Sequence, residues 1–346
     1  MSDLDIRIEG CAGRITLTRP KALNALTWEM CRDVSRALDE WRDDECVSLV
    51  VMDGTGDRAF CAGGDIAEMY RRGTSGDFDF GRGFWADEYR MNRKLYHYPK
   101  PVAAFMHGFT MGGGVGIGCH GSHRVVCESS QLAMPECGIG LIPDVGGTLL
   151  LARAPGRLGE YLGLGGARMG PADAIHAGFA DHYVPQAAWP ELIAALERTG
   201  EWHRIEAAAG DPPPGDLEQR QAEIDGLFGG ASIAEVLAAL ANSEAPFATE
   251  TLGVLGRNSP LSMACTLELI RRARAADTIE AALEQEYRFT WRSMEHADFL
   301  EGTCAAVIDK DRQPRWLHER VSDVSADEVE RMLAPLGDET LDWEEA

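Results

Sequence analysis

Two carboxylates, Glu136 and Asp144, stand in a segment of the chain that is otherwise mostly apolar or glycine. Residues 134–147 read Met-Pro-Glu-Cys-Gly-Ile-Gly-Leu-Ile-Pro-Asp-Val-Gly-Gly. A carboxylate among apolar residues is costly unless it is paired, hydrogen-bonded or used in chemistry. A turn with two solvated acids explains the segment less well, because the isoleucines and the leucine need burial and the glycines permit close approach of the backbone. The segment therefore predicts one wall of an active site.

Two glycine-rich segments each precede an expected helix. They are Cys61-Ala62-Gly63-Gly64-Asp65 and Gly112-Gly113-Gly114. Each can present a backbone N–H at a helix N-terminus, where the dipole favours negative charge. Two such groups that converge on one point form an oxyanion hole, in which one donor is worth about 3–4 kcal/mol of transition-state stabilisation. Glycines that only permit tight turns explain one segment easily, but both together less well.

Several other kinds of site are disfavoured by the sequence. It lacks a Walker-type phosphate loop, a G-x-S-x-G elbow and an H-E-x-x-H helix. Cys119-His120 is expected to be a buried thiol beside a surface imidazole rather than a dyad, because sequence neighbours on a helix do not face each other. Residues 116–121 match G-x-G-x-x-G, but residues 108–115 separate them from the preceding strand, which disfavours a dinucleotide site. No metal-ligand spacing relates the histidines at positions 97, 107, 123, 176 and 182.

Composition limits the class of protein. The 346 residues are 45% hydrophobic, enough for a large core, and the apolar runs are too short to span a bilayer. The net charge of −23 disfavours nucleic acid and anionic membranes as partners. The nine cysteines form no C-x-x-C pair, and the polar N-terminus carries no signal pattern. We therefore expect a soluble, cytoplasmic protein with reduced thiols.

Alternating strand and helix patterns must position these segments. Strands are expected at residues 5–9, 14–18, 47–52, 102–106 and 124–127, with helices after Thr27 as N-cap, at 66–71 and around 84–96. This alternation indicates an α/β core, or a core of repeated strand-strand-helix turns. From residue 156 onward helical patterns dominate, at 158–164, 171–177, 190–197, 233–240, 261–274 and 278–294. Residues 211–216 are expected to form a linker, and 323–345 a solvated helix with a frayed acidic end.

The ordered motifs resemble the crotonase (enoyl-CoA hydratase/isomerase) superfamily. The resemblance rests on residues 19–26, 60–66, 112–114, 135–136 and 142–147, and it covers roughly residues 5–316. Within the superfamily the chain is most similar to the 3-hydroxyisobutyryl-CoA hydrolases, through residues 111–116, 143–147, 299–302 and 308–311. The resemblance implies an α/β, crotonase-like spiral of strand-strand-helix units. Residues 1–200 would form the acyl-CoA-binding catalytic core, and residues 201–346 a helical region packed on it that ends in the acidic tail.

Two departures from the hydratase pattern set the expected chemistry. Hydratases of this superfamily add water to a double bond with two glutamates, and the position of one of them is Gly116 here, while the other matches Glu136. Where hydratases have glycine after Ile-Pro, this chain has Asp144. The hydrolase family shows the same exchange. The resemblance therefore implies hydrolysis of a short 3-hydroxyacyl-CoA thioester, 3-hydroxyisobutyryl-CoA in valine degradation, with an enoyl-CoA hydratase or isomerase as the alternative.

The resemblance also assigns roles to residues. The N–H groups of Gly64 and Gly113 would stabilise the oxyanion, and Glu136 would be either the general base for water or the nucleophile of a transient anhydride. Asp144 would bind the 3-hydroxyl of the substrate or orient water, and its charge should raise the proton affinity of Glu136 if the two are close. Glu88 would point toward the substrate pocket, whereas the residue pattern alone favours an exposed helical acid.

Coenzyme A would be part of the substrate, and no cofactor or metal is implied. The superfamily binds the adenine near residues 65–69, which places Asp65 and Ile66 at the nucleotide, and Lys21 would meet the phosphates. A non-enzymatic acyl-CoA-binding protein is the alternative from a different class. The preferred acyl group stays open, as does the choice between a monomer and a homo-oligomer.

Overall fold

The computed structural model describes residues 3–343, and contacts within the chain divide it into two compact units. The first unit contains the residues up to Gly64 together with Asp87–Ala133 and Arg168–Gln219. The second contains Asp65–Ala86, Met134–Ala167 and the residues from Arg220 onward. Residues 1–2 and 344–346, which include the end of the predicted acidic tail, lie outside the described residues. The predicted division of the chain at residue 200 stays a prediction.

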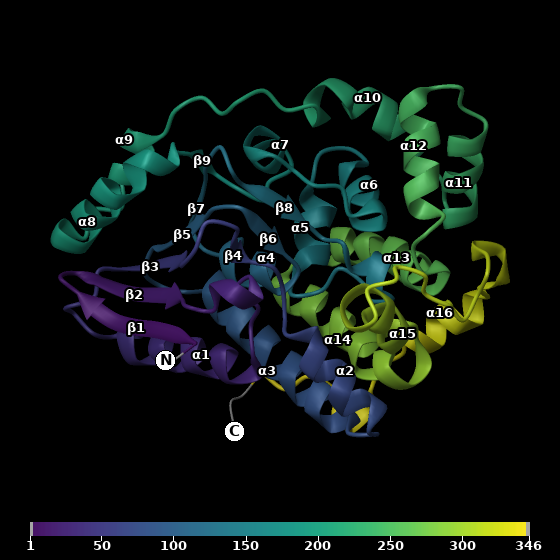
Figure 1. Ribbon diagram of the computed structural model, residues 1–346, viewed down its shortest axis with the longest axis horizontal. Coiled ribbons are helices and arrows are strands. Elements are labelled where there is room, and N and C mark those ends of the chain that lie inside the picture. The colour runs from purple at the N-terminus through teal and green to yellow at the C-terminus, as the bar shows by residue number, and fades with distance from the viewer. Residues whose placement is uncertain (1–2, 344–346) are drawn as a thin grey trace. The chain divides into compact units, whose positions relative to one another are not determined.

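A six-stranded sheet in the first unit has the order β1-β2-β3-β5-β7-β9 (Figure 1). Only β1 and β2 pair in antiparallel fashion, and the remaining neighbours are parallel. All five residues of β5 are buried, as a continuous apolar run in a parallel sheet requires. The strands are β1 Leu4–Glu9, β2 Ala12–Leu17, β3 Leu49–Gly54, β5 Val102–Met106, β7 His123–Val126 and β9 His182–Tyr183.

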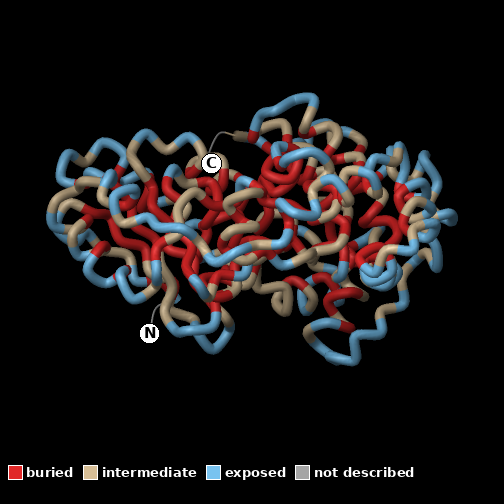
Figure 2. The backbone as a smooth tube through the Cα atoms, turned by 90° about the horizontal axis from the view of Figure 1, so that it is seen from above, coloured by how far each residue is buried: buried red, intermediate tan, exposed pale blue. Residues whose placement is uncertain are grey.

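Helices cover both faces of this sheet because neighbouring residues of a strand point to opposite sides. On one face, apolar side chains of β2, β3, β5 and β7 pack with α8 (Trp189–Thr199) and α9 (Arg204–Ala208). On the other, Gly13 of β2 faces the ring of Trp41 on α1 (Trp28–Arg42). The side chain of Thr27 caps α1, as predicted. Buried segments alternate with exposed ones along the chain (Figure 2).

A second, three-stranded sheet explains the repeat of the fold. Strands β4 (Ala59–Cys61), β6 (Phe109–Met111) and β8 (Gln131–Ala133) pair in parallel. Each follows a strand of the large sheet, and each is followed by a helix: α2 (Ile66–Thr74), α4 (Gly113–Gly118) or η2 (Glu136–Ile139). The chain thus repeats a strand-strand-helix unit, which confirms the predicted crotonase-like α/β class.

Helices also make up the remainder of the chain. The first unit contains η1 Pro20–Ala22, the C-terminal part of α3 (Phe78–Tyr96), α7 Pro171–His176 and η3 Gln186–Ala188. Helix α10 (Leu217–Leu227) begins in the first unit and continues into the second. The second unit contains α5 Gly147–Arg153, α6 Leu158–Gly165, α11 Ile233–Ala241, α12 Pro246–Leu255, α13 Pro260–Ala276, α14 Ile279–His296, α15 Phe299–Thr303, η4 Cys304–Ile308, η5 Val321–Asp323, α16 Ala326–Met332 and η6 Gly337–Glu339. Among the described helices, none has both the length and the apolarity to cross a membrane.

The structure differs from the predicted elements where the segments are short. Phe60 and Cys61, which lie outside the expected strands, are the end of β4, and Met111, also outside them, ends β6. Strands of three residues are too short to show the period of two that identifies a strand. The linker expected at residues 211–216 does lie between α9 and α10.

Candidate active site

Gly113 and Gly64 lie next to each other in the first unit. Gly112, which precedes α4, has φ 50° and ψ −120°, a backbone conformation that favours glycine. Helix α4 therefore starts at Gly113 without a side-chain cap, and the first amides of a helix have no partner within it. A Cβ atom on Gly113 would lie only 3.1 Å from the backbone nitrogen of Gly64. The structure brings the two predicted amides together, and their role as an oxyanion hole stays a prediction.

Glu88 borders the same space. It lies on α3 and is 2% exposed, so the interpretation as a solvated helical acid is wrong. Its Oε1 atom would lie 2.7 Å from a Cβ on Gly113. Burial first, and then the charge of Glu88, raise the pKa of the Cys31 thiol well above its ordinary value. The first unit therefore places a carboxylate beside two backbone amides, in a space that only glycine at position 113 leaves open.

Glu136 and Asp144 belong to the second unit and are both buried. Glu136 is the first residue of η2 and is 5% exposed, and Asp144 is 4% exposed. All residues from 141 to 150 are buried, as the apolar pattern predicts. Close backbone approach also occurs: a Cβ on Gly140, where φ is +74°, would overlap the backbone of Asp298. The sequence therefore identified two buried carboxylates correctly, and their catalytic roles stay predictions.

The residues after Asp144 form a tight, strained turn. The Gly147 N–H donates to the Asp144 carbonyl at 2.7 Å, and Val145 and Gly146 have φ of 55° and 78°. A left-handed conformation is unusual for a β-branched residue such as valine, and its cost is of order 1–3 kcal/mol. Helix α5 then begins at Gly147 without a side-chain cap from Gly146.

Sequence reasoning missed Glu286, a fully buried acid on α14. Its Oε2 accepts from the Gly146 N–H at 2.7 Å, and its Oε1 accepts from the Thr148 N–H at 3.0 Å and from the Thr148 hydroxyl. Burial is the main cause that raises the pKa of Glu286 to about 8, the hydrogen bonds lower it, and the charge of Asp144 raises it further. The sequence contains a pattern that indicates this burial: Glu286 lies at helical spacing from Leu283 and Thr290, which share the buried face of α14.

The residues predicted to bind coenzyme A have separate local roles. The Asp65 carboxylate caps α2 by accepting from the Glu68 N–H at 3.4 Å, and Ile66 starts that helix in the second unit. Lys21 is the exposed middle residue of η1 in the first unit. A cap and an exposed lysine are compatible with a role at the nucleotide, and this role stays a prediction.

Cys119 and His120 do not form a reactive thiol–imidazole pair. Burial raises the pKa of the Cys119 thiol to about 12, so the thiol is inert near neutral pH. His120 is buried, and its expected position at the surface is wrong. Within residues 3–343, no group of three or more histidine, cysteine or acidic side chains is arranged to hold a metal ion.

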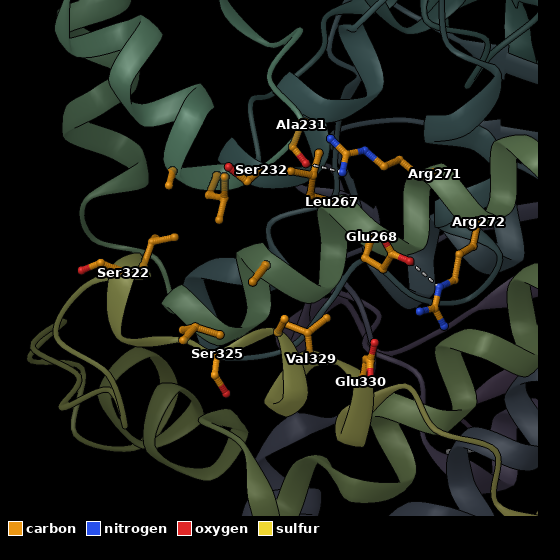
Figure 3. Close-up of a pocket in the computed structure, with 16 residues that line it drawn as sticks. Ala231, Ser232, Leu267, Glu268, Arg271, Arg272, Ser322, Ser325, Val329 and Glu330 are labelled. Carbon is orange, nitrogen blue, oxygen red and sulfur yellow. Dashed lines mark hydrogen bonds and ion pairs between the residues drawn. The ribbon is translucent and has the colours of Figure 1, made fainter.

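A cavity of about 460 Å³ also lies in the second unit, between α11, α13, η5 and α16 (Figure 3). Its two guanidinium groups are already engaged: Arg271 donates to the carbonyls of Gly230 and Ala231, and Arg272 pairs with Glu268. None of the predicted site residues is among the sixteen that line it. The cavity is therefore separate from the predicted chemistry.

Comparison with known proteins settles the family. The family model described as enoyl-CoA hydratase/isomerase matches residues 12–333. The chain belongs to this family. It is therefore an acyl-CoA enzyme of the crotonase superfamily, which confirms the resemblance seen in the sequence. The mitochondrial 3-hydroxyisobutyryl-CoA hydrolase of Gallus gallus is 35% identical over 98% of this chain and 91% of that protein, and the human one is 35% identical over 96% and 89%.

Solved structures of the same fold carry other names. The structure described as an enoyl-CoA hydratase from Rhodobacter sphaeroides is 55% identical, with a TM-score of 0.94 over 99% of this chain and 100% of that one. The structure described as a carnitinyl-CoA dehydratase from Mycobacterium thermoresistibile is 40% identical, with a TM-score of 0.95 over 100% of both chains. Family and fold are thus established, but the relatives are named for different reactions: hydrolysis, hydration and dehydration.

Proposed function

We propose that the protein hydrolyses the thioester of a short 3-hydroxyacyl-CoA, with 3-hydroxyisobutyryl-CoA as its substrate in valine degradation. The observation that carries the proposal is the buried carboxylate of Asp144, together with glycine at position 116. The hydratase pattern has glycine at the position of Asp144 and glutamate at the position of Gly116. A hydratase built on this chain would have lost one of its two acid–base groups, whereas a hydrolase needs only one group to activate water. The hydrolases that are 35% identical support the same reaction.

The proposed reaction adds water to the thioester carbonyl. The N–H groups of Gly64 and Gly113 stabilise the negative oxygen of the tetrahedral intermediate. Glu136 takes a proton from the attacking water, the carbon–sulfur bond breaks, and the thiolate of coenzyme A receives a proton. Glu88 and Asp144 contact the acyl group, and Asp144 accepts from its 3-hydroxyl or orients the water. Asp65, Ile66 and Lys21 bind the coenzyme A portion.

A second route keeps the same residues but makes Glu136 a nucleophile. Its carboxylate attacks the thioester carbonyl and releases coenzyme A thiolate, and water then hydrolyses the mixed anhydride. A single turnover in water labelled with heavy oxygen tests for the anhydride, because only this route can label Glu136 itself. The general-base route places the label only in the acid product, whereas water attack on the Glu136 carbonyl of the anhydride places it in the Glu136 side chain, where peptide mass spectrometry detects it.

An enoyl-CoA hydratase is the second candidate, favoured by the 55% identical structure that is described as an enoyl-CoA hydratase. The test measures two activities on one preparation: release of free thiol from acyl-CoA substrates with and without a 3-hydroxyl, and loss of the conjugated double bond of crotonyl-CoA. We expect thiol release that is fastest with the 3-hydroxyacyl-CoA, and no useful hydration. Efficient hydration without thiol release would transfer the assignment to a hydratase. An absence of both activities with binding retained would favour a non-catalytic acyl-CoA-binding protein.

The proposal also includes the location of the protein and its binding partner. We keep the cytoplasm as the expected location, supported by the nine cysteines, all of which are free thiols. The word mitochondrial in the names of the relatives describes those proteins. The acyl-CoA substrate is the small-molecule partner in this proposal.

A further inference from the structure

Glu286 is a buried carboxyl that neither route of the proposed reaction uses. It lies on α14, and its side chain is held by three hydrogen bonds to one short stretch of chain, Gly146 to Thr148. That stretch is 138 to 140 positions away in the sequence. Buried carboxyl groups are expensive, so one that is fully buried and directed at the start of a neighbouring helix calls for a physical reason.

The start of α5 supplies that reason. Gly146, the N-cap residue of α5, has no side chain that could accept from the first amides of the helix. The carboxylate of Glu286 accepts from two of these amides and so replaces the missing cap from outside the helix. The hydroxyl of Thr148 can donate to Glu286 or accept from it, so these contacts persist whether Glu286 is ionised or protonated.

The cap also fixes the strained turn that precedes it. Val145 keeps a left-handed conformation that a valine adopts only when its surroundings enforce it. The Gly146 N–H bound by Glu286 is the next amide in the chain, and the Gly147 N–H closes the turn on the Asp144 carbonyl. Without the anchor at Gly146, the turn could relax and rotate the side chain of Asp144.

We propose that Glu286 is a positioning residue for Asp144, holding the 144–147 turn in the conformation that directs the Asp144 carboxylate toward its function. This inference rests on the proposed function in so far as Asp144 takes part in the reaction. The charge of Asp144 also raises the pKa of Glu286, which shows that the two carboxyl groups are close enough to interact.

Substitution of Glu286 by glutamine is the most selective perturbation, because it keeps the shape of the side chain. An amide group has only one acceptor oxygen, so its NH₂ group must face either the Gly146 or the Thr148 N–H. Thr148→Val is a milder second variant that removes only the hydroxyl donor, and Thr148→Ser restores it. Glu284→Gln is the matched control, since Glu284 lies on the same helix and pairs with Arg288 near the surface.

The decisive readout is a double-mutant cycle with Asp144→Gly, measured as kcat/KM for thiol release from a 3-hydroxyacyl-CoA. Because a misplacement of about 1 Å can cost about a hundredfold in rate, we expect Glu286→Gln to lower kcat/KM about tenfold to a hundredfold in the natural chain. In the Asp144→Gly background, where there is nothing left to position, the same change should cost no more than about twofold. A merely structural role would give equal losses in both backgrounds and would overturn the proposal.

Amide hydrogen exchange of the peptide that covers residues 144–149 gives an independent readout. We expect faster exchange in Glu286→Gln and Thr148→Val than in the natural chain, Thr148→Ser or Glu284→Gln, and unchanged exchange refutes the anchor. If Glu286→Gln does not fold, Thr148→Val carries both measurements. If the natural protein releases no thiol, the proposed function has failed, and the exchange experiment alone decides the role of Glu286.

Discussion

Alanine at position 113 tests the predicted oxyanion hole most directly. Gly113 begins α4 and is not among the glycines with positive φ, so its backbone accepts alanine. The added Cβ would lie 2.7 Å from Oε1 of Glu88, 3.1 Å from the nitrogen of Gly64 and 3.3 Å from the carbonyl carbon of Gly63. The first distance is well below a normal contact, so the methyl group fills the space over the Gly64 amide and must displace Glu88.

The structure gives the expected size of the effect. The loss of one oxyanion-hole donor costs about a hundredfold to a thousandfold in kcat, and the methyl group obstructs the space between two donors. We therefore expect kcat for thiol release to fall at least about a hundredfold. The free energy of unfolding should fall by at most about 3 kcal/mol. Overpacking costs typically about 1–3 kcal/mol, and the better helix propensity of alanine offsets up to about 1 kcal/mol of it.

The assay measures free-thiol release and thermal unfolding on the same preparations. Gly253→Ala is the matched control: Gly253 is an exposed glycine of α12, and its Cβ would meet no atom within 4 Å. This control should keep its kcat and gain up to about 1 kcal/mol in stability. Removal of an oxyanion-hole donor lowers kcat far more than about threefold. If Gly113→Ala folds and its kcat stays within about threefold of the natural value, the space beside Gly64 does not hold the oxyanion.

Two further substitutions test the proposed reaction, and a third tests the contribution of buried ion pairs to stability. Glu136→Gln should lower kcat about a hundredfold to ten-thousandfold while substrate binding survives, and a near-normal rate of thiol release would remove Glu136 from the centre of the reaction. Asp144→Gly should fold normally and lose about 1.5–3 kcal/mol, about tenfold to a hundredfold in kcat/KM, on the 3-hydroxyacyl-CoA but not on the matching acyl-CoA; equal losses on both would assign Asp144 to the water or to Glu136. For Glu160, burial raises the pKa, but the hydrogen bonds and charges of Arg274 and Arg157 outweigh burial and leave the pKa below 4.5. The ion pairs therefore stabilise the fold above pH 4.5, and this contribution is lost as the pH falls through the lowered pKa. Glu160→Gln should cost less than the about 3–5 kcal/mol of a fully buried pair, because both arginines are partly exposed, and the loss measured by denaturant unfolding should shrink in acid.

The features that the sequence alone predicted are those that depend on interactions between residues close together in the chain. The run Val102–Met106 is apolar at every position, so it had to be a buried strand, and the structure has the strand β5 with the same bounds. Thr27 precedes an amphipathic stripe and caps α1, because a hydroxyl at that position satisfies an orphan amide. Glu136 and Asp144 are buried because their neighbours must be. Each of these conclusions follows from residues within a few positions of one another.

Tertiary structure decided the features that join distant parts of the chain. The three-residue strands β4, β6 and β8 exist only because each pairs with another, and no local period marks them. The approach of Gly64 to Gly113 depends on how β4, β6 and α4 pack, since backbone amides leave no trace of their partners in the residue pattern. Helical spacing indicates the burial of Glu286, yet its partners Gly146 and Thr148 lie 138 to 140 positions away. A sequence pattern indicates whether a side chain is buried, because buried positions favour particular residue types. The packing of the whole fold decides which buried groups contact each other.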